Sequence, residues 1–275
     1  FEFDIEEIYF RDYNQYNFDN IPIICLPGLT RNCKDFHNFA QLFSNSRRII
    51  SIDMRGRGNS DYDKSAKNYW KPEIYMSDIF AITSSLNIHK AIYVGTSLGG
   101  LMAMQVALLR PTSVSGIILN DIGPNLPEDG VNSIRKNLIK PLEFYSWEEA
   151  SQYYKTKYKH HHPKINDKKW MELTKNTFRY KNKRIISDYD KKILIGSVRS
   201  SQSNNLWKLY GAIKNIPSIV LRGELSDILL EDTYNKMKLI KEDIIQLTVR
   251  NCGHNPILDE PEVINLTENF FHSLK

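Results

Sequence analysis

The chain of 275 residues is 41% hydrophobic and 25% charged, and this length accommodates one large α/β domain or two small ones. No apolar stretch approaches the roughly 18 residues that span a bilayer, and no basic-then-apolar signal segment opens the chain, so we expect no membrane association. The cysteines Cys25, Cys33 and Cys252 lack the spacing of metal ligands or of a disulfide framework. This usage favours a reducing compartment, and we predict a cytoplasmic protein.

Positive charge is concentrated in the middle third of the chain. The net charge is +5, and residues 124–215 hold 19 Lys and Arg against 9 Asp and Glu. Such a field can attract acidic ligands, but lysine-rich solvated helices are its commoner cause. No motif for RNA or DNA binding accompanies the charge, so we expect a small-molecule substrate and no nucleic-acid partner.

Apolar runs rich in β-branched residues alternate with helical patterns along most of the chain. Helical patterns at 34–45, 75–88 and 98–110 lie between the first four expected strands. This alternation predicts an α/β fold with a mostly parallel sheet flanked by helices. The expected strands cover residues 21–28, 47–54, 90–95, 114–121, 216–223 and 243–249.

The alternation stops in the middle of the chain. Residues 123–212 are rich in Lys, Tyr and Trp and show helical patterns without an obvious series of strands. We therefore predict one core domain, formed by residues 1–122 and 213–275, with residues 123–212 as a helical insertion.

The stretch "YVGTSLGGLM", residues 93–102, places Ser97 between Gly95 and Gly99 at the junction of an expected strand and an expected helix. In so tight a turn, small flanking residues let the chain fold back while the serine Oγ stays accessible. The helix beyond Ser97 points its N-terminal N–H groups at any anion formed there. Ser97 is therefore a candidate nucleophile for acyl chemistry.

A serine nucleophile needs a base, usually a histidine. Of the seven histidines, only His254, in "NCGHNP", lies in a loop that follows an expected strand. The loops at the carboxyl ends of parallel strands gather at one edge of the sheet, so His254 can face Ser97. The run 160–162, "HHH", lacks a carboxylate at a suitable spacing and is interpreted as a solvated polar segment, not as a metal site.

Two carboxylates follow expected strands and could orient the imidazole of His254. Asp227, in "LRGELSDIL", precedes His254 by 27 residues, and Asp121, in "LNDIGP", follows the strand next to that of the nucleophile. We favour Asp227 and interpret Asp121 as the cap of the turn into the insertion. Asp53, in "DMRGRGNSD", is expected to be structural, paired with a nearby arginine or with backbone N–H groups.

Acyl transfer also needs hydrogen-bond donors for the oxyanion. One expected donor is the backbone N–H of Leu98, at the start of the helix after the nucleophile. The other is the N–H of Leu29, in the loop after the first parallel strand, where Gly28 permits the turn.

Five motifs, "LPGLT", "DMRGRGNSD", "GTSLGG", "LRGELSD" and "CGHNP", follow one another in an order that resembles the α/β-hydrolase superfamily over nearly the whole chain. The resemblance implies a sheet of about eight strands, a helical cap inserted after the sixth strand, and the triad Ser97, Asp227 and His254. Within the superfamily, the chain resembles small bacterial carboxylesterases, enol-lactonases and meta-cleavage-product hydrolases. Thr96 stands where carbon–carbon hydrolases often carry Asn, which makes a carbon–carbon substrate less favoured.

These residues predict a serine hydrolase that cleaves a small carboxylic ester or lactone through an acyl-enzyme, with no metal and no cofactor. Carbon–carbon bond hydrolysis of a dienoate and acyl transfer to an acceptor other than water use the same residues. A non-catalytic ligand-binding member of the fold is less favoured, because residues of all three triad types are present. The aromatic residues of the insertion are assigned to packing and none to substrate: Trp147, Tyr153, Tyr154, Trp170 and Trp207.

Overall fold

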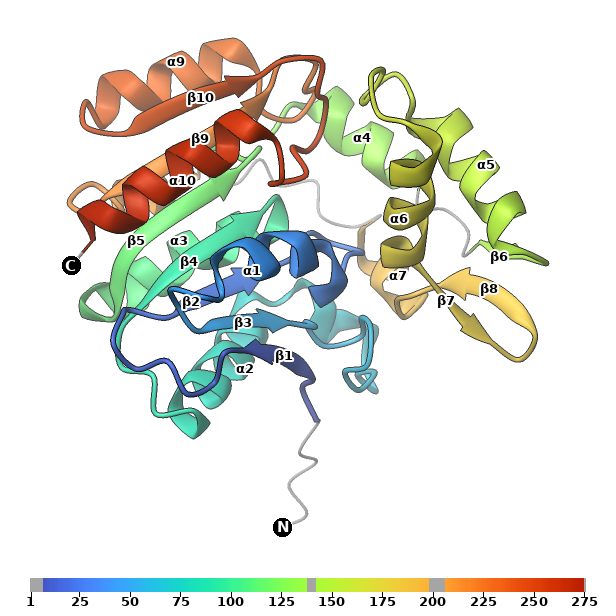
Figure 1. Ribbon diagram of the computed structural model, residues 1–275, viewed down its shortest axis with the longest axis horizontal. Helices are drawn as coiled ribbons and strands as arrows, with labels where there is room; N and C mark the ends of the chain where they lie inside the picture. Colours follow the sequence, from blue (N-terminus) through green and yellow to red (C-terminus); the bar gives the residue numbers. More distant parts are fainter. Residues whose placement is uncertain (1–6, 138–141, 198–205, 275) are drawn as a thin grey trace.

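A seven-stranded sheet with the order β1-β3-β2-β4-β5-β9-β10 forms the centre of the computed structural model, which describes residues 7–137, 142–197 and 206–274 (Figure 1). Every strand pair in the sheet is parallel except β1 with β3. The expected α/β fold is confirmed, with seven strands where about eight were expected. The strands are β1 (Phe10–Tyr13), β2 (Ile23–Leu26), β3 (Ile49–Ile52), β4 (Ala91–Thr96), β5 (Val114–Asn120), β9 (Ser218–Gly223) and β10 (Ile245–Val249).

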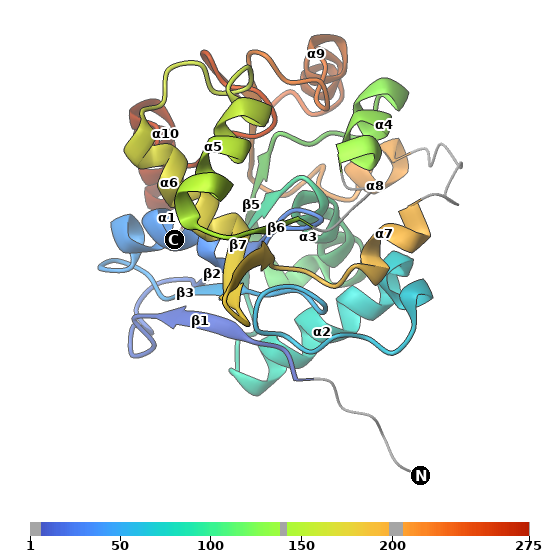
Figure 2. The same ribbon diagram turned by 90° about the vertical axis from the view of Figure 1, so that its right-hand side faces the viewer.

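Helices cover both faces of this sheet, as a parallel sheet requires. Figure 2 shows α1 and α10 on one side and α2, α3 and α8 on the other. Side chains of α9 pack on the same side as α2 and α3. The helices are α1 (His37–Phe43), α2 (Pro72–Ser85), α3 (Leu98–Leu109), α8 (Trp207–Gly211), α9 (Glu231–Ile240) and α10 (Pro261–Ser273), with the 3-10 helices η1 (Cys33–Phe36), η2 (Ala66–Trp70) and η3 (Pro111–Ser113).

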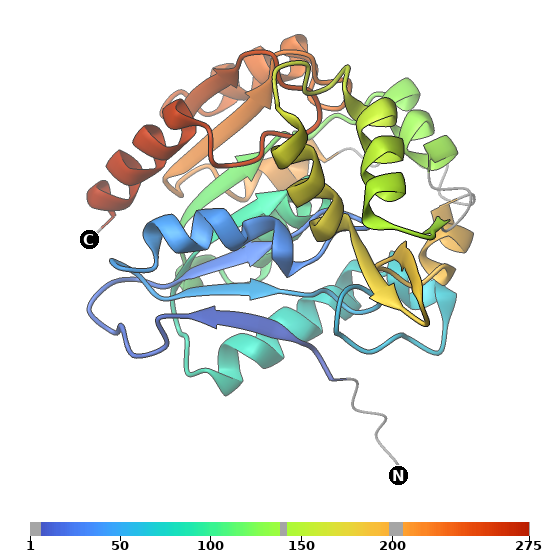
Figure 3. The same cartoon turned by 45° about the vertical axis from the view of Figure 1, so that its right-hand side comes forward.

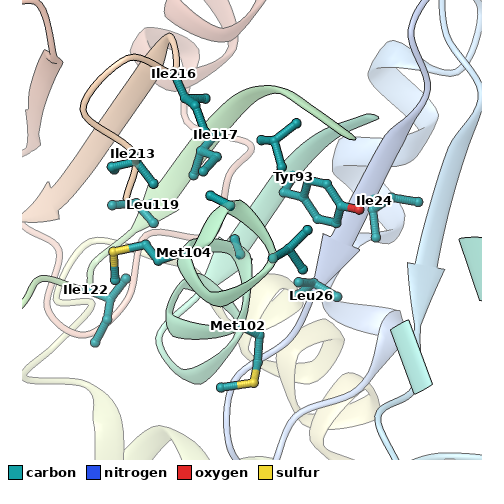
Figure 4. Packing of buried hydrophobic residues seen from close by; sticks show 14 of the residues in the cluster. Ile24, Leu26, Tyr93, Met102, Met104, Ile117, Leu119, Ile122, Ile213 and Ile216 are labelled. Atoms are coloured by element: carbon teal, nitrogen blue, oxygen red, sulfur yellow. The ribbon is translucent and has the colours of Figure 1, made fainter. Parts of the chain in front are cut away.

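The central strands are apolar on both faces, and for this reason they form the interior of the sheet. Every residue of β2, β4 and β5 is buried. In the close-up of Figure 4, Tyr93 of β4 lies near Ile24 of β2, and Met104 of α3 lies near Leu119 of β5. Each fully buried side chain of this size contributes about 2 kcal/mol relative to an exposed one. This packing holds the junction of β4 and α3, where Ser97 lies, in a fixed position.

The insertion lies beyond the carboxyl ends of the parallel strands (Figure 3). It follows β5, the fifth strand of the chain, where the sequence predicted a position after a sixth strand. The expectation of helices alone is wrong, because the insertion also contains a three-stranded antiparallel sheet with the order β6-β8-β7. Its elements are α4 (Glu128–Asn137), β6 (Glu143–Phe144), α5 (Trp147–Tyr158), α6 (Asp167–Thr177), β7 (Phe178–Lys181), β8 (Arg184–Ser187) and α7 (Lys192–Ser197).

The end of the insertion is fixed to the loop that carries the "DMRGRGNSD" motif. Gly58 N donates to the Asp188 carbonyl (3.0 Å), and Asp190 N donates to the Gly56 carbonyl (2.7 Å). Within the motif, Asp53 accepts hydrogen bonds from two backbone N–H groups, as expected for a structural carboxylate. The motif therefore joins the insertion to the sheet. The domain limits at residues 122 and 213 stay predictions.

Candidate active site

Ser97 occupies the sharp turn between β4 and α3. Its backbone has φ 51° and ψ −115°, a conformation that L-residues rarely adopt and that surrounding structure must enforce. A Cβ at Gly95 would collide with the backbone of Gly99, and a Cβ at Gly99 would collide with the Leu26 carbonyl. The two glycines of the motif are therefore required by the close approach of strand and helix, as the sequence predicted.

Ser97 and His254 line the same pocket, which has a volume of about 220 Å³. Ser97 comes from the end of β4, and His254 comes from the loop after β10. A Cβ at Gly28 would lie 3.8 Å from the Cβ of Ser97, so the loop after β2 closes over the serine. The structure thus brings together the predicted nucleophile and the predicted base.

The carboxylate beside His254 is that of Asp121 and not that of Asp227. Asp121 Oδ2 lies 2.6 Å from His254 Nδ1, and the Asp121 side chain is completely buried. The expectation that Asp227 would contact His254 is corrected by this geometry. Asp227 lines the pocket instead.

The loop after β9 explains why Asp121, and not Asp227, contacts His254. Asp121 directly follows β5, whereas Asp227 lies beyond the end of β9 at Gly223. Gly223 N donates to Asp121 Oδ1 (2.8 Å), and the Ser226 hydroxyl donates to Asp121 Oδ2 (2.6 Å). The "GELSD" turn therefore presents Ser226, and not Asp227, to the buried carboxylate. Both Asp121 oxygens therefore accept hydrogen bonds, and Oδ2 also faces His254 Nδ1, an arrangement that orients the imidazole.

Asn120 ties together the three loops of the site and was not singled out in the sequence. It is fully buried, and its Nδ2 donates to Thr96 Oγ1 (3.0 Å) and to the Pro256 carbonyl (2.9 Å). Thr96 precedes the nucleophile and Pro256 follows the histidine, so one amide connects both neighbourhoods to the start of the Asp121 turn. Its place beside Asp121 was the only signal in the sequence.

Arg57 is a second residue whose role the sequence did not indicate. Its guanidinium is fully buried, and Nε donates to the carbonyl of Leu29 (2.7 Å). Nη1 donates to the Tyr75 hydroxyl (2.7 Å). The predicted oxyanion loop is thus anchored from behind by an arginine. Leu29 lines the pocket, and Leu98 is the first residue of α3, where N–H groups have no acceptor within the helix.

Two histidines of the insertion pack against the loop of His254. Gly253 N donates to the His161 carbonyl (2.6 Å), and His162 Nδ1 lies 3.7 Å from Cys252 Sγ. Burial lowers the pKa of His161, and burial with neighbouring histidines lowers the pKa of His162 to about 4. The expectation of a solvated run is wrong for these two side chains, while that of His160 is exposed.

The insertion supplies aromatic walls to the pocket. Of the five aromatic residues considered in the sequence, Tyr154 lines the pocket, whereas Trp170 is buried and Trp207 packs against the main core. Tyr158, Phe178 and Tyr189 line the pocket as well. The Arg31 side chain extends from the core to this wall, and its Nη1 donates a hydrogen bond to the Thr177 hydroxyl.

Comparison with known proteins identifies the family. A profile of the alpha/beta hydrolase fold matches residues 21–261. A 3-hydroxybutyrate-oligomer hydrolase of Cupriavidus necator is 30% identical over 270 residues, which cover 90% of this chain and 87% of that protein. The chain belongs to the α/β hydrolase family.

Crystal structures of other proteins agree with this assignment. That of an α/β hydrolase from Novosphingobium aromaticivorans has a TM-score of 0.92 at 33% identity and covers 98% of this chain and 95% of its own. A structure from Rickettsia typhi has a TM-score of 0.89 at 27% identity and covers 98% and 92%. The oligomer hydrolase and these structures confirm the prediction that this chain is a hydrolase that acts on ester bonds.

The described ranges contain neither a membrane-spanning helix nor a cluster of metal-ligating side chains. No helix of this α/β hydrolase within residues 7–137, 142–197 and 206–274 is long and apolar enough to cross a membrane. In the same ranges, no group of three or more His, Cys, Asp or Glu side chains could hold a metal ion. The cytoplasmic location stays a prediction.

Proposed function

We propose that this chain is a serine hydrolase that cleaves a small carboxylic ester through an acyl-enzyme. The observation that carries the proposal is the convergence of Ser97 and His254 in one pocket, with the buried Asp121 bonded to the far side of the imidazole. A nucleophile, a base and a carboxylate that orients the base are the parts that this chemistry requires.

In the first half of the reaction, the Ser97 hydroxyl attacks the carbonyl carbon of the ester. Because Nδ1 of His254 faces Asp121, Nε2 takes the serine proton, and Asp121 stabilises the resulting imidazolium. The N–H groups of Leu29 and Leu98 hold the oxyanion of the tetrahedral intermediate. The protonated His254 then gives its proton to the departing alcohol, leaving an ester of Ser97.

In the second half, water attacks the acyl group on Ser97, and Nε2 of His254 takes a proton from this water. The second tetrahedral intermediate uses the same oxyanion donors. Its collapse releases the carboxylic acid and returns the proton to Ser97. Asp121 keeps the imidazole in one tautomer in both halves, and no metal or cofactor takes part.

The substrate that we propose is an ester or short oligoester of a hydroxyalkanoic acid. The relative of similar length from Cupriavidus necator is named as a 3-hydroxybutyrate-oligomer hydrolase. The pocket volume of about 220 Å³ suits a short acyl group and is small for a long fatty-acyl chain. The partly apolar walls of Tyr154, Tyr158 and Phe178 fit the methyl and methylene groups of such an acid.

The test is a hydrolysis assay of the purified protein and its Ser97→Ala variant. The substrates are p-nitrophenyl esters from acetate to octanoate, a lactone, a dienoate, and the dimer and trimer of 3-hydroxybutyrate. We expect turnover of short esters and of the oligomers, and loss of this turnover in Ser97→Ala. Ester turnover that is equal in both proteins, or turnover of the dienoate alone, would refute the proposal.

A further inference from the structure

Asp227 is a pocket carboxylate that the proposed mechanism leaves unused. It lines the same pocket as Ser97 and His254 and is only partly exposed. The bond of His254 is made with Asp121, and the hydroxyl that supports Asp121 comes from Ser226. Within the described part of the chain, no side chain or backbone group donates a hydrogen bond to the Asp227 carboxylate.

The backbone around Asp227 is held by hydrogen bonds and by close packing. Ile228 N and Leu229 N both donate to the Ser226 hydroxyl, at 3.2 and 3.1 Å. On the other side, α4 approaches so closely that a Cβ at Gly130 would collide with the Asp227 carbonyl. This turn places Asp227 at the wall of the pocket, where its charge also acts on the imidazole of His161.

The surroundings of the carboxylate favour a neutral hydrogen-bond donor as its partner. A half-buried carboxylate without a protein donor can accept a hydrogen bond from a ligand hydroxyl. A second carboxylate at this position would be repelled. A substrate ammonium would share the pocket with the cationic side chain of Lys157, whereas a hydroxyl carries no such cost.

We propose that Asp227 binds a hydroxyl group of the substrate and so selects esters of hydroxy acids over esters of the corresponding unsubstituted acids. This inference rests on the proposed function. It assigns to Asp227 the choice of substrate and to Asp121 the orientation of His254. The residue that the sequence indicated as the catalytic acid is then a specificity residue that contacts the substrate.

The experiment compares ethyl 3-hydroxybutyrate, as both enantiomers, with ethyl butyrate, because these esters share a leaving group and differ in one hydroxyl. The proteins are the wild type, Asp227→Leu, Asp227→Asn, and the control Asp232→Asn, which changes an exposed carboxylate of α9. We expect the wild type to prefer one enantiomer of the hydroxy ester over ethyl butyrate by about 10- to 100-fold in kcat/KM. Asp227→Leu should abolish this preference, Asp227→Asn should keep part of it through its amide oxygen, and Asp232→Asn should keep all of it.

Three results would overturn the inference. A preference that survives in Asp227→Leu would show that another group reads the hydroxyl. An equal loss of kcat on both esters, by a factor of about 1,000 or more, would make Asp227 the carboxylate that orients the base. Failure of the proposed function is distinct, because the wild type would then hydrolyse neither ester. Ethyl 3-aminobutyrate preferred over the hydroxy ester would likewise refute the choice of a hydroxyl.

Discussion

His254 Nδ1 and Asp121 Oδ2 lie 2.6 Å apart, although the two residues are separated by 133 positions in the chain. The contact joins the end of β5 to the loop after β10 across the intervening strand β9. Asp121 is completely buried, and its other bonds come from Gly223 N and the Ser226 hydroxyl. The contact with Nδ1 keeps the imidazole in the tautomer that leaves Nε2 free to accept a proton.

Asp121→Asn should lower kcat by about 1,000- to 10,000-fold, because the amide favours the wrong tautomer of His254. The amide oxygen can still accept the bond from Gly223 N, so the variant should remain folded. The measurement is kcat on a short p-nitrophenyl ester together with a thermal unfolding curve. Asp227→Asn provides the comparison, and we expect its loss of kcat on that ester to be at least tenfold smaller. The reverse order of the two variants would contradict the role given to Asp121.

Arg57→Lys should lower kcat by about 10- to 100-fold and leave KM within a few-fold of the wild type, because the loop of Leu29 loses its anchor. If Arg57 had only a structural role, the substitution would lower the free energy of unfolding without lowering kcat at a nearly constant KM. The control is Arg47→Lys, since Arg47 is also buried and donates to the Phe271 carbonyl on the opposite side of the sheet. An unchanged kcat in folded Arg57→Lys would exclude the anchoring role.

Acid should destabilise the protein through His162. Burial lowers the pKa of His162 to about 4 in the folded state, whereas an unfolded histidine titrates near about 6.5. The unfolded state therefore binds more protons between these values, so this contribution is present above about pH 6.5 and is lost as the pH falls toward 4. A difference of one pKa unit between the two states corresponds to about 1.4 kcal/mol, so the loss in free energy of unfolding reaches about 2 to 3 kcal/mol at pH 4.5.

Urea unfolding at pH 7 and pH 4.5 measures this effect. His162→Gln should lose less free energy of unfolding between the two pH values than the wild type does, because glutamine does not titrate. His160→Gln, which changes the exposed neighbour, should keep the wild-type difference. Equal losses in His162→Gln and the wild type would show that the acid sensitivity comes from other groups.

Tyr158→Ala should widen the acyl pocket. The ring of Tyr158 lines the pocket and lies 4.7 Å from the ring of Tyr154, centroid to centroid. Removal of the ring leaves space for additional methylene groups, so the ratio of kcat/KM for p-nitrophenyl octanoate to that for butyrate should rise by about tenfold. Tyr180→Ala, on the exposed surface of β7, is the control. An unchanged ratio in Tyr158→Ala would place the acyl chain elsewhere.

Local sequence signals were sufficient to predict that Ser97 and His254 lie at one pocket. A Cβ at either glycine beside Ser97 would collide with the backbone, so both positions require glycine. The resulting motif is visible in the sequence as five consecutive residues. His254 was found because loops after parallel strands gather at one edge of a sheet. The choice between Asp121 and Asp227 depended on how the turn around Ser226 folds, and both carboxylates follow strands in the sequence.

Features that depend on contacts between distant segments were missed. The strands β7 (Phe178–Lys181) and β8 (Arg184–Ser187) are short, and β7 alternates aromatic with cationic residues, so neither shows a long apolar run. The burial of His161 and His162 comes from packing against residues about 90 positions away. Arg57 likewise looked like one charge in an arginine-rich loop, because its partner Leu29 belongs to another strand's loop.

The central claim is that Ser97 is an activated nucleophile, and labelling with a fluorophosphonate tests it most directly. Such a probe forms a covalent bond with a serine that a neighbouring histidine activates. We predict one phosphonyl group per chain, located on the peptide that carries Ser97 by mass spectrometry, and much slower labelling in His254→Gln. Labelling that persists in Ser97→Ala, or a folded wild-type protein that takes up no label, would contradict the account.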